Sequence, residues 1–314
     1  MQLFKKRKNY ISRTAKRRIF ALLMLAIPLL QFAIFYVYVN LNSILMAFRE
    51  YTFDIENSGY IVEFVGFANF EKALDIMLSP IGGEMLLNSL KLYGCNLVIV
   101  MGLALIFSYY IAKKFPMAGF FRVVLYLPHV VSSVVLAILY RYLVTDVYID
   151  FVLKLTGAEV SGLLELGNGT QYPTILFYSV WMGFGINVML FTNAMSGINS
   201  SVLESAKLDG VNVVQEFIYI YIPMIFPTFI TFIVTGLAGL FTNQMSLLAF
   251  FGDSGKNDFN VYGFYLYVKA LRADYVGETT YSMLSAMGLI ITLIVAPITI
   301  GVRKLLRKYG PSVD

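Results

Sequence analysis

The sequence predicts an all-α membrane protein with six transmembrane helices and one cytoplasmic helix-turn-helix. Of its 314 residues, 58% are hydrophobic and only 14% are charged, and the mean hydropathy is +0.72. Soluble domains are less apolar than this. The chain also contains several apolar runs of about 20 residues or more, which is the length that crosses a bilayer as a helix. Basic residues gather in alternate connections between these runs, as in multi-pass membrane proteins.

Six apolar runs are expected to cross the membrane. They cover Ile19 to Phe48, Leu86 to Ala112, Phe121 to Thr145, Tyr172 to Ala194, Met224 to Phe251 and Ser282 to Val302. The first run is longer than a bilayer requires, so it either tilts or continues into the outer aqueous space. Its basic flank and its length exclude a cleaved signal peptide.

The distribution of basic residues among the loops predicts the orientation of the chain in the membrane. With the N-terminus inside, the inner segments hold fifteen basic and four acidic residues, whereas the outer loops hold six basic and fifteen acidic residues. The sequence therefore predicts a basic cytoplasmic tail (1–18), a six-span domain (19–302) and a cytoplasmic C-terminal tail (303–314). Gly157 and Gly255 are expected outside. Lys114, Ser200 and Tyr309 are expected inside.

The basic residues lie where anionic lipid headgroups would be, so the net charge of +5 indicates membrane lipid as a partner and not nucleic acid. Cys95 is the single cysteine, which leaves no disulfide framework and no thiolate metal site. The single histidine, His129, is interpreted as a packing or helix-bend residue. No phosphate-binding, metalloprotease or nucleophile-elbow motif occurs, so the chain is not expected to be an enzyme or to bind a metal or cofactor itself.

The segment 201–223 is the most polar interruption of the second half of the chain. Ser201 and Glu204 fit a capping box, which predicts the start of a helix. Asp209-Gly210 predicts its end, and Asn212 with Gln215 predicts a second cap. The following helix is expected to run until Pro223, which lacks a backbone donor. The sequence thus predicts a helix-turn-helix between the fourth and fifth spans.

The spacing of this segment resembles the EAA motif of ABC importer permeases, EAA-x3-G-x9-I-x-LP. The matching residues are Glu204, Ser205, Ala206, Gly210, Ile220, Ile222 and Pro223, with Ser205 and Ile222 departing from the motif.

Other stretches resemble the same family in its sugar-uptake branch. "FVGFANF" (64–70) is similar to FVGLxNY, and "NSL" (88–90) is similar to NTL. Residues 121–128 are similar to the family's FR…LP segment, with Phe121, Arg122, Leu127 and Pro128 in place. The resemblance covers Ile19 to the C-terminus and is greatest to the maltose-transporter type of permease. It implies the type I ABC importer permease fold.

The resemblance also implies an importer in the bacterial cytoplasmic membrane. Its other parts would be a second homologous permease, two cytoplasmic ATP-binding subunits that hold ATP and Mg²⁺, and an extracellular solute-binding protein that delivers a sugar. The coupling segment would dock on an ATPase, with Glu204 facing a basic side chain and Gly210 forming the turn. The ATPase-coupling residues are then Glu204, Ser205, Ala206, Asp209, Gly210, Ile220 and Pro223. The acidic outer loops would meet the solute-binding protein.

The family resemblance supplies no residue motif for the sugar path. Candidate residues are therefore chosen by their depth in the membrane and by the chemistry of their side chains. Amides pair with sugar hydroxyls and aromatic rings pack on sugar C–H faces. Trp181, Asn187, Asn243 and Gln244 are the candidates. The alternatives are hydrogen bonding between helices by the amides and an interfacial role for Trp181.

Two other functions stay open from the sequence. One is an ABC permease for a different solute, such as an amino acid or a phosphate ester. The other is a self-sufficient carrier or channel, although no acidic residue is expected at the membrane midplane to couple transport to protons.

Overall fold

The computed structural model describes residues 13–54, 59–252, 258–277 and 280–311. Within these ranges four helices are long and apolar enough to span a membrane, and two pairs of bent helices raise the number to six if each pair is one span. The four are Thr14–Met46, Pro80–Ala112, Gln171–Ser196 and Tyr281–Tyr309. The predicted helical membrane fold is confirmed. Residues 1–12 of the predicted N-terminal tail, residues 312–314 of the C-terminal tail and Gly255 lie outside the described ranges.

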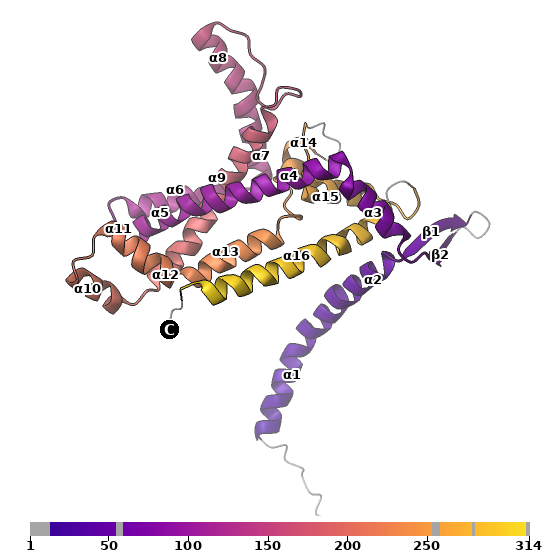
Figure 1. The fold of residues 1–314 in the computed structure, drawn as a ribbon, viewed down its shortest axis with the longest axis horizontal. Coiled ribbons are helices and arrows are strands. Elements are labelled where there is room, and N and C mark those ends of the chain that lie inside the picture. Colours follow the sequence, from indigo (N-terminus) through magenta and orange to yellow (C-terminus); the bar gives the residue numbers. More distant parts are fainter. Residues whose placement is uncertain (1–12, 55–58, 253–257, 278–279, 312–314) are drawn as a thin grey trace, which may run out of the picture.

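The first span stands apart from the other helices. It consists of α1 (Arg13–Phe32), the π-helical η1 (Ala33–Tyr38) and α2 (Val39–Met46). Figure 1 shows it slanting away from the bundle, and its most apolar 18 residues have no buried member. Its C-terminal end reaches α16 (Tyr281–Tyr309), where Ala47 is fully buried. An antiparallel hairpin that the sequence did not predict follows, made by β1 (Arg49–Asp54) and β2 (Gly59–Phe64).

The bundle itself is built from four long segments, which are α4–η2–α5 (Pro80–Cys95, Asn96–Val100 and Met101–Ala112), α9 (Gln171–Ser196), α13 (Phe226–Ala238) and α16. In Figure 1, α4–α5, α13 and α16 have similar directions, and α9, which packs on α5, crosses them at an angle. The start of α4 is set by the Ser79 hydroxyl, which accepts from the Gly82 N–H at 3.2 Å, and by Pro80, whose missing donor is harmless there. α3 (Ala68–Leu78) precedes α4 and packs on α16.

The third predicted span, Phe121 to Thr145, is wrong as a continuous helix. α6 (Ala118–Val130) ends at Val131, which is extended, and the helix α7–η3–α8 (Ser133–Tyr142, Leu143–Val147 and Tyr148–Thr156) leaves at 97°. Pro128 lies one turn before the break and cannot donate to the preceding turn. His129 accepts from the Ile186 N–H at 3.2 Å and stacks on Tyr126, in accordance with its predicted packing role.

The fifth predicted span, Met224 to Phe251, is also interrupted. α13 ends at Ala238, and the next helix, α14 (Leu247–Phe251), begins only after an irregular connection. In that connection the Asn243 side chain accepts from the Met245 N–H at 2.8 Å, and Met245 and Ser246 have φ angles of 53° and 58°. An asparagine that binds its own backbone in this way competes with the helix. Asn243 and Gln244 therefore lie in a turn and not in a helix.

Buried apolar residues form three clusters along the bundle. One joins α5, α9 and residues 217–225 around Tyr109, Phe191 and Tyr221. A second joins α7, α9 and α14, and a third joins α3, α4, α15 (Tyr262–Arg272) and α16. Figure 1 places α10 and α11 with the described C-terminal end at one end of the bundle, and α3, α15 and the hairpin at the other.

Candidate functional site: the coupling segment and a polar cavity

The segment 201–223 folds as a helix-turn-helix, as predicted. α10 (Ser200–Leu208) is followed by a turn, by α11 (Val213–Glu216), by the π-helical η4 (Phe217–Tyr221) and by α12 (Ile222–Met224). Gly210 has a φ angle of 75°, in the left-handed region that glycine adopts without strain. The predicted turn at Asp209-Gly210 is therefore confirmed.

The caps of the two helices differ in part from the prediction. The predicted capping box at Ser201 and Glu204 is wrong, because Asn199 caps α10 by accepting from the Ser201 N–H at 3.1 Å. Asparagine is among the strongest N-caps, and it stands one residue before the helix begins. The second predicted cap is a complete capping box, in which Asn212 accepts from the Gln215 N–H at 2.9 Å and Gln215 accepts from the Asn212 N–H at 3.1 Å.

The helix that follows the turn ends next to Pro223, as predicted. α11, η4 and α12 form one helix, Val213–Met224, in which Pro223 is the second-to-last residue, and the 66° bend to α13 falls at Ile225. Proline cannot donate a backbone hydrogen bond, which favours the end of a helix at this point.

Most residues of α10 are exposed. Of the predicted coupling residues, Glu204, Ser205 and Asp209 are exposed, and only Ala206 is buried. Ile220 and Pro223 are partly buried farther along the segment. Apolar side chains are exposed on the same segment: Val202, Leu208, Val213, Val214, Ile218 and Tyr219. A carboxylate beside exposed apolar side chains suits docking of a partner protein.

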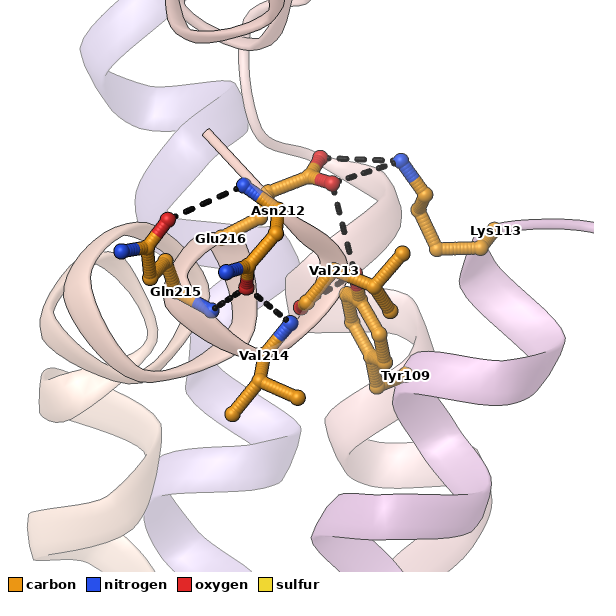
Figure 2. Close-up of polar contacts among 7 residues, drawn as sticks. All are labelled: Tyr109, Lys113, Asn212, Val213, Val214, Gln215 and Glu216. Atoms are coloured by element: carbon orange, nitrogen blue, oxygen red, sulfur yellow. Dashed lines mark hydrogen bonds and ion pairs between the residues drawn. The ribbon is translucent and has the colours of Figure 1, made fainter. Parts of the chain in front are cut away.

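The structure adds a buried ion pair that the sequence did not predict. Figure 2 shows Glu216 of α11 facing Lys113 and Tyr109 at the end of α5. The Lys113 Nζ atom lies 2.9 Å from both carboxylate oxygens, and the two side chains are 18% and 6% exposed. The Tyr109 hydroxyl lies 3.1 Å from the Val213 carbonyl oxygen and 3.3 Å from the Glu216 carboxylate.

A polar cavity of about 340 Å³ lies between α4, η2, α9 and α13. Its polar lining residues are Ser89, Tyr93, Asn96, Asn187, Thr235, Thr242 and Asn243. The structure therefore brings Asn187 and Asn243 of the predicted sugar path together. Three apolar residues and two glycines complete the lining, so the cavity offers both amide groups and apolar surface.

The other two predicted path residues do not line this cavity. Trp181 is 39% exposed and packs its edge against the ring of Tyr178, with the centroids 6.0 Å apart. Gln244 follows Asn243 in the turn but is not among the lining residues. Sequence reasoning missed Ser89 and Asn96, although polar residues within the apolar run 86–112 were the available signal.

A second cavity, of about 430 Å³, lies between α13 and α16. Thr235 lines both cavities, and Thr231 lies one turn nearer to α12. Arg303 and Arg307 line the second cavity toward the end of α16. Thr231 and Thr235 thus place hydroxyl groups along α13 from the second cavity to the first.

Comparison with known proteins agrees with this arrangement. Residues 99–313 match the family described as "Binding-protein-dependent transport system inner membrane component".

The similar proteins include two permeases of known sequence and a chain of a solved transporter structure. The probable ABC transporter permease protein YurN of Bacillus subtilis is 27% identical over 278 residues, which are 85% of this chain and 90% of that protein. The arabinooligosaccharides transport system permease protein AraP of Halalkalibacterium halodurans is 25% identical over 279 residues, 87% of this chain and 83% of that protein. A chain of a bacterial ABC transporter involved in the import of the acidic polysaccharide alginate superposes with a TM-score of 0.76 at 20% identity, covering 95% of this chain and 98% of the other.

Proposed function

The chain belongs to the family of binding-protein-dependent transport system inner membrane components, and on that premise we propose that it is the permease subunit of an ATP-driven importer of a carbohydrate. The single observation that carries the proposal is the exposed coupling segment, 201–223, beside a bundle with a polar cavity. A self-sufficient carrier has no need of such a docking surface.

The proposed cycle uses both features. A cytoplasmic ATPase binds the exposed side of α10, where Glu204 meets a basic side chain of the ATPase groove. Closure of the ATPase pair on ATP moves the coupling segment and shifts the permease between inward-facing and outward-facing states. A second homologous permease and an extracellular solute-binding protein complete the importer, with both termini of this chain on the cytoplasmic side.

The substrate class is argued from the cavity and the relatives. Amide and hydroxyl groups from three helices surround a space with apolar walls, which suits a ligand with many hydroxyls and apolar C–H faces. The arabinooligosaccharide transport named for one relative supports the same class. ATP and Mg²⁺ belong to the ATPase subunits in this proposal.

The test is ATP-dependent uptake by the assembled importer in proteoliposomes. The complex contains this chain, its partner permease and its two ATPases, and the solute-binding protein is added outside. Labelled arabino-oligosaccharides, alginate oligosaccharides, glycerol 3-phosphate and an amino-acid mixture are offered separately. Accumulation of a saccharide only with ATP and the solute-binding protein is the expected result.

Two results would contradict the proposal. Uptake of glycerol 3-phosphate or amino acids without any saccharide would assign the importer to another solute. Uptake by this chain alone, without the ATPases, would make it a self-sufficient carrier.

A further inference from the structure

The coupling segment is fastened to the bundle at one buried polar contact. Glu216 is 6% exposed, and its carboxylate lies 2.9 Å from Lys113 and 3.3 Å from the hydroxyl of Tyr109. The Tyr109 ring also packs edge-on against Tyr221, with the centroids 4.9 Å apart.

By contrast, α10 has a single buried residue, Ala206. α10 is also joined to α9 by residues 197–199 and packs Leu203 against the cluster of α5 and α9. The Glu216 contact adds a second connection to the bundle, through α11 and α5.

Stability alone does not account for this ion pair. Two buried charges lose their hydration, and apolar residues of similar volume often replace such pairs without loss of stability. What an ion pair adds is a defined geometry: Lys113 contacts both carboxylate oxygens, and Tyr109 contacts both Glu216 and Val213. This contact holds α11 in one position relative to the end of α5.

Ser108, which directly precedes Tyr109 in α5, connects this contact to α9 and so toward the cavity. The Ser108 hydroxyl is fully buried and donates to the Val188 carbonyl oxygen of α9 at 2.8 Å. Val188 follows Asn187, whose side chain lines the cavity. Consecutive residues of α5 thus bind the coupling segment on one side and the cavity wall on the other.

We propose that Glu216, Lys113, Tyr109 and Ser108 form a rigid joint that transmits movement of the coupling segment to α9 beside the cavity. These are positioning residues, and the inference rests on the proposed function. Packed side chains, hydrogen-bond networks and rigid helices can together carry energetic coupling between two sites in a protein. Loss of the joint is expected to separate ATP hydrolysis from transport.

The experiment measures transport per ATP hydrolysed by the complete importer in proteoliposomes. Lys113→Met with Glu216→Leu removes both charges at once and leaves no uncompensated buried ion. We expect the amount and the thermal stability of the complex to be close to wild type and ATP hydrolysis to continue. Transport per ATP should fall about tenfold, within the range of couplings changed by residues between two sites. The charge swap, Lys113→Glu with Glu216→Lys, should restore most of it.

A second variant keeps the inference testable if the double variant does not fold. Tyr109→Phe keeps the ring packing and removes only the hydroxyl, so it should lower transport per ATP less than the double variant does, with no change in the amount of complex. Wild-type transport per ATP in both variants would overturn the joint. A loss of stability with unchanged transport per ATP would give the ion pair a purely structural role and would overturn it as well.

A conformational readout separates this inference from the proposed function. In a Cys95→Ala background, Thr242→Cys reports on the cavity through its rate of labelling by a thiol reagent. ATP should change that rate with an intact joint and should change it much less in the double variant. Equal responses to ATP would reject the joint, whereas failure of the wild-type importer to take up any saccharide would reject only the proposed substrate class.

Discussion

Gly210 makes its contribution through the backbone alone. A Cβ atom built on it meets no atom within 4 Å, so the position has room for a side chain. Its φ angle of 75° is the constraint, because this region is unfavourable for L-residues with branched side chains.

Two substitutions at Gly210 should therefore differ. Gly210→Val forces a β-branched residue into the left-handed region at a cost of about 1 kcal/mol or more, and the turn between α10 and α11 should change direction. Saccharide uptake should be lost while insertion into the membrane is normal. Gly210→Asn is the matched control, because asparagine tolerates this conformation, and it should retain most of the uptake. Equal uptake by both variants would show that the turn is not needed for coupling.

Asn187 is the cavity residue that α9 contributes. It lies within α9, and its side chain donates to the Gly183 carbonyl oxygen at 2.6 Å. Asn187→Leu should raise the half-saturating saccharide concentration about fivefold, since one hydrogen bond to the ligand contributes about 1 kcal/mol. Asn193→Leu, on the same helix but exposed and outside the cavity lining, should have no such effect. Identical uptake kinetics for the two variants would place the sugar path elsewhere.

At the scale of elements, α6 and α9 approach one another closely at Gly185. A Cβ atom there would overlap the carbonyl oxygen of Leu125, which is backbone and cannot rotate away. The packing of this pair of helices thus depends on one glycine.

Gly185→Ala should separate α6 from α9 and destabilise the protein by about 1–3 kcal/mol, the usual effect of overpacking. The apparent melting temperature of the detergent-purified chain should fall. Gly102→Ala on α5 is the control, because nothing lies within 4 Å of its Cβ position, and alanine favours a helix. An unchanged melting temperature for Gly185→Ala would mean that the two helices are not this close.

The sequence predicted the coupling segment well because its signals are local. The turn at Gly210 and the cap at Asn212 each depend on residues within four positions of one another. The interruptions at residues 131–132 and 239–246 were not predicted, because hydropathy is the same for one straight helix and for two apolar helices at an angle. Pro128 and Asn243 were the residues in the sequence that could have indicated the two interruptions.

The ion pair of Lys113 with Glu216 was beyond prediction from a single sequence. The two residues are 103 positions apart, and each looks like an ordinary charge at a membrane surface. Only the packing of α11 against α5 brings them together and buries them. The cavity could not be predicted in full either, because its lining comes from segments far apart in the sequence. Of the four predicted path residues, two line the cavity and two do not.

At the scale of the whole molecule, the presence of several membrane-spanning helices followed from hydropathy, because a bilayer accepts only long apolar segments whose backbone is fully hydrogen-bonded. The described residues contain four such helices, or six if each bent pair is one span. The separation of the first span from the bundle could not be predicted, because hydropathy does not distinguish a helix that faces lipid from one that packs on other helices. Orientation rests on charge and stays a prediction.

Labelling of introduced cysteines tests that orientation. With Cys95 replaced by alanine, Gly157→Cys should react with an impermeant thiol reagent on intact cells, because it belongs to an acidic outer loop. Lys114→Cys, Ser200→Cys and Tyr309→Cys should react only after the membrane is opened. Reaction of Ser200→Cys on intact cells would place the coupling segment outside and exclude its contact with a cytoplasmic ATPase.

The isolation of α1 also affects the order in which the protein is made. This helix precedes all the other described helices in the chain, and its apolar residues find no buried position against them. Its insertion into lipid therefore does not wait for any later segment to be synthesised. During translation the first span can settle in the bilayer by itself, and the later spans then assemble while the chain is already anchored at one end.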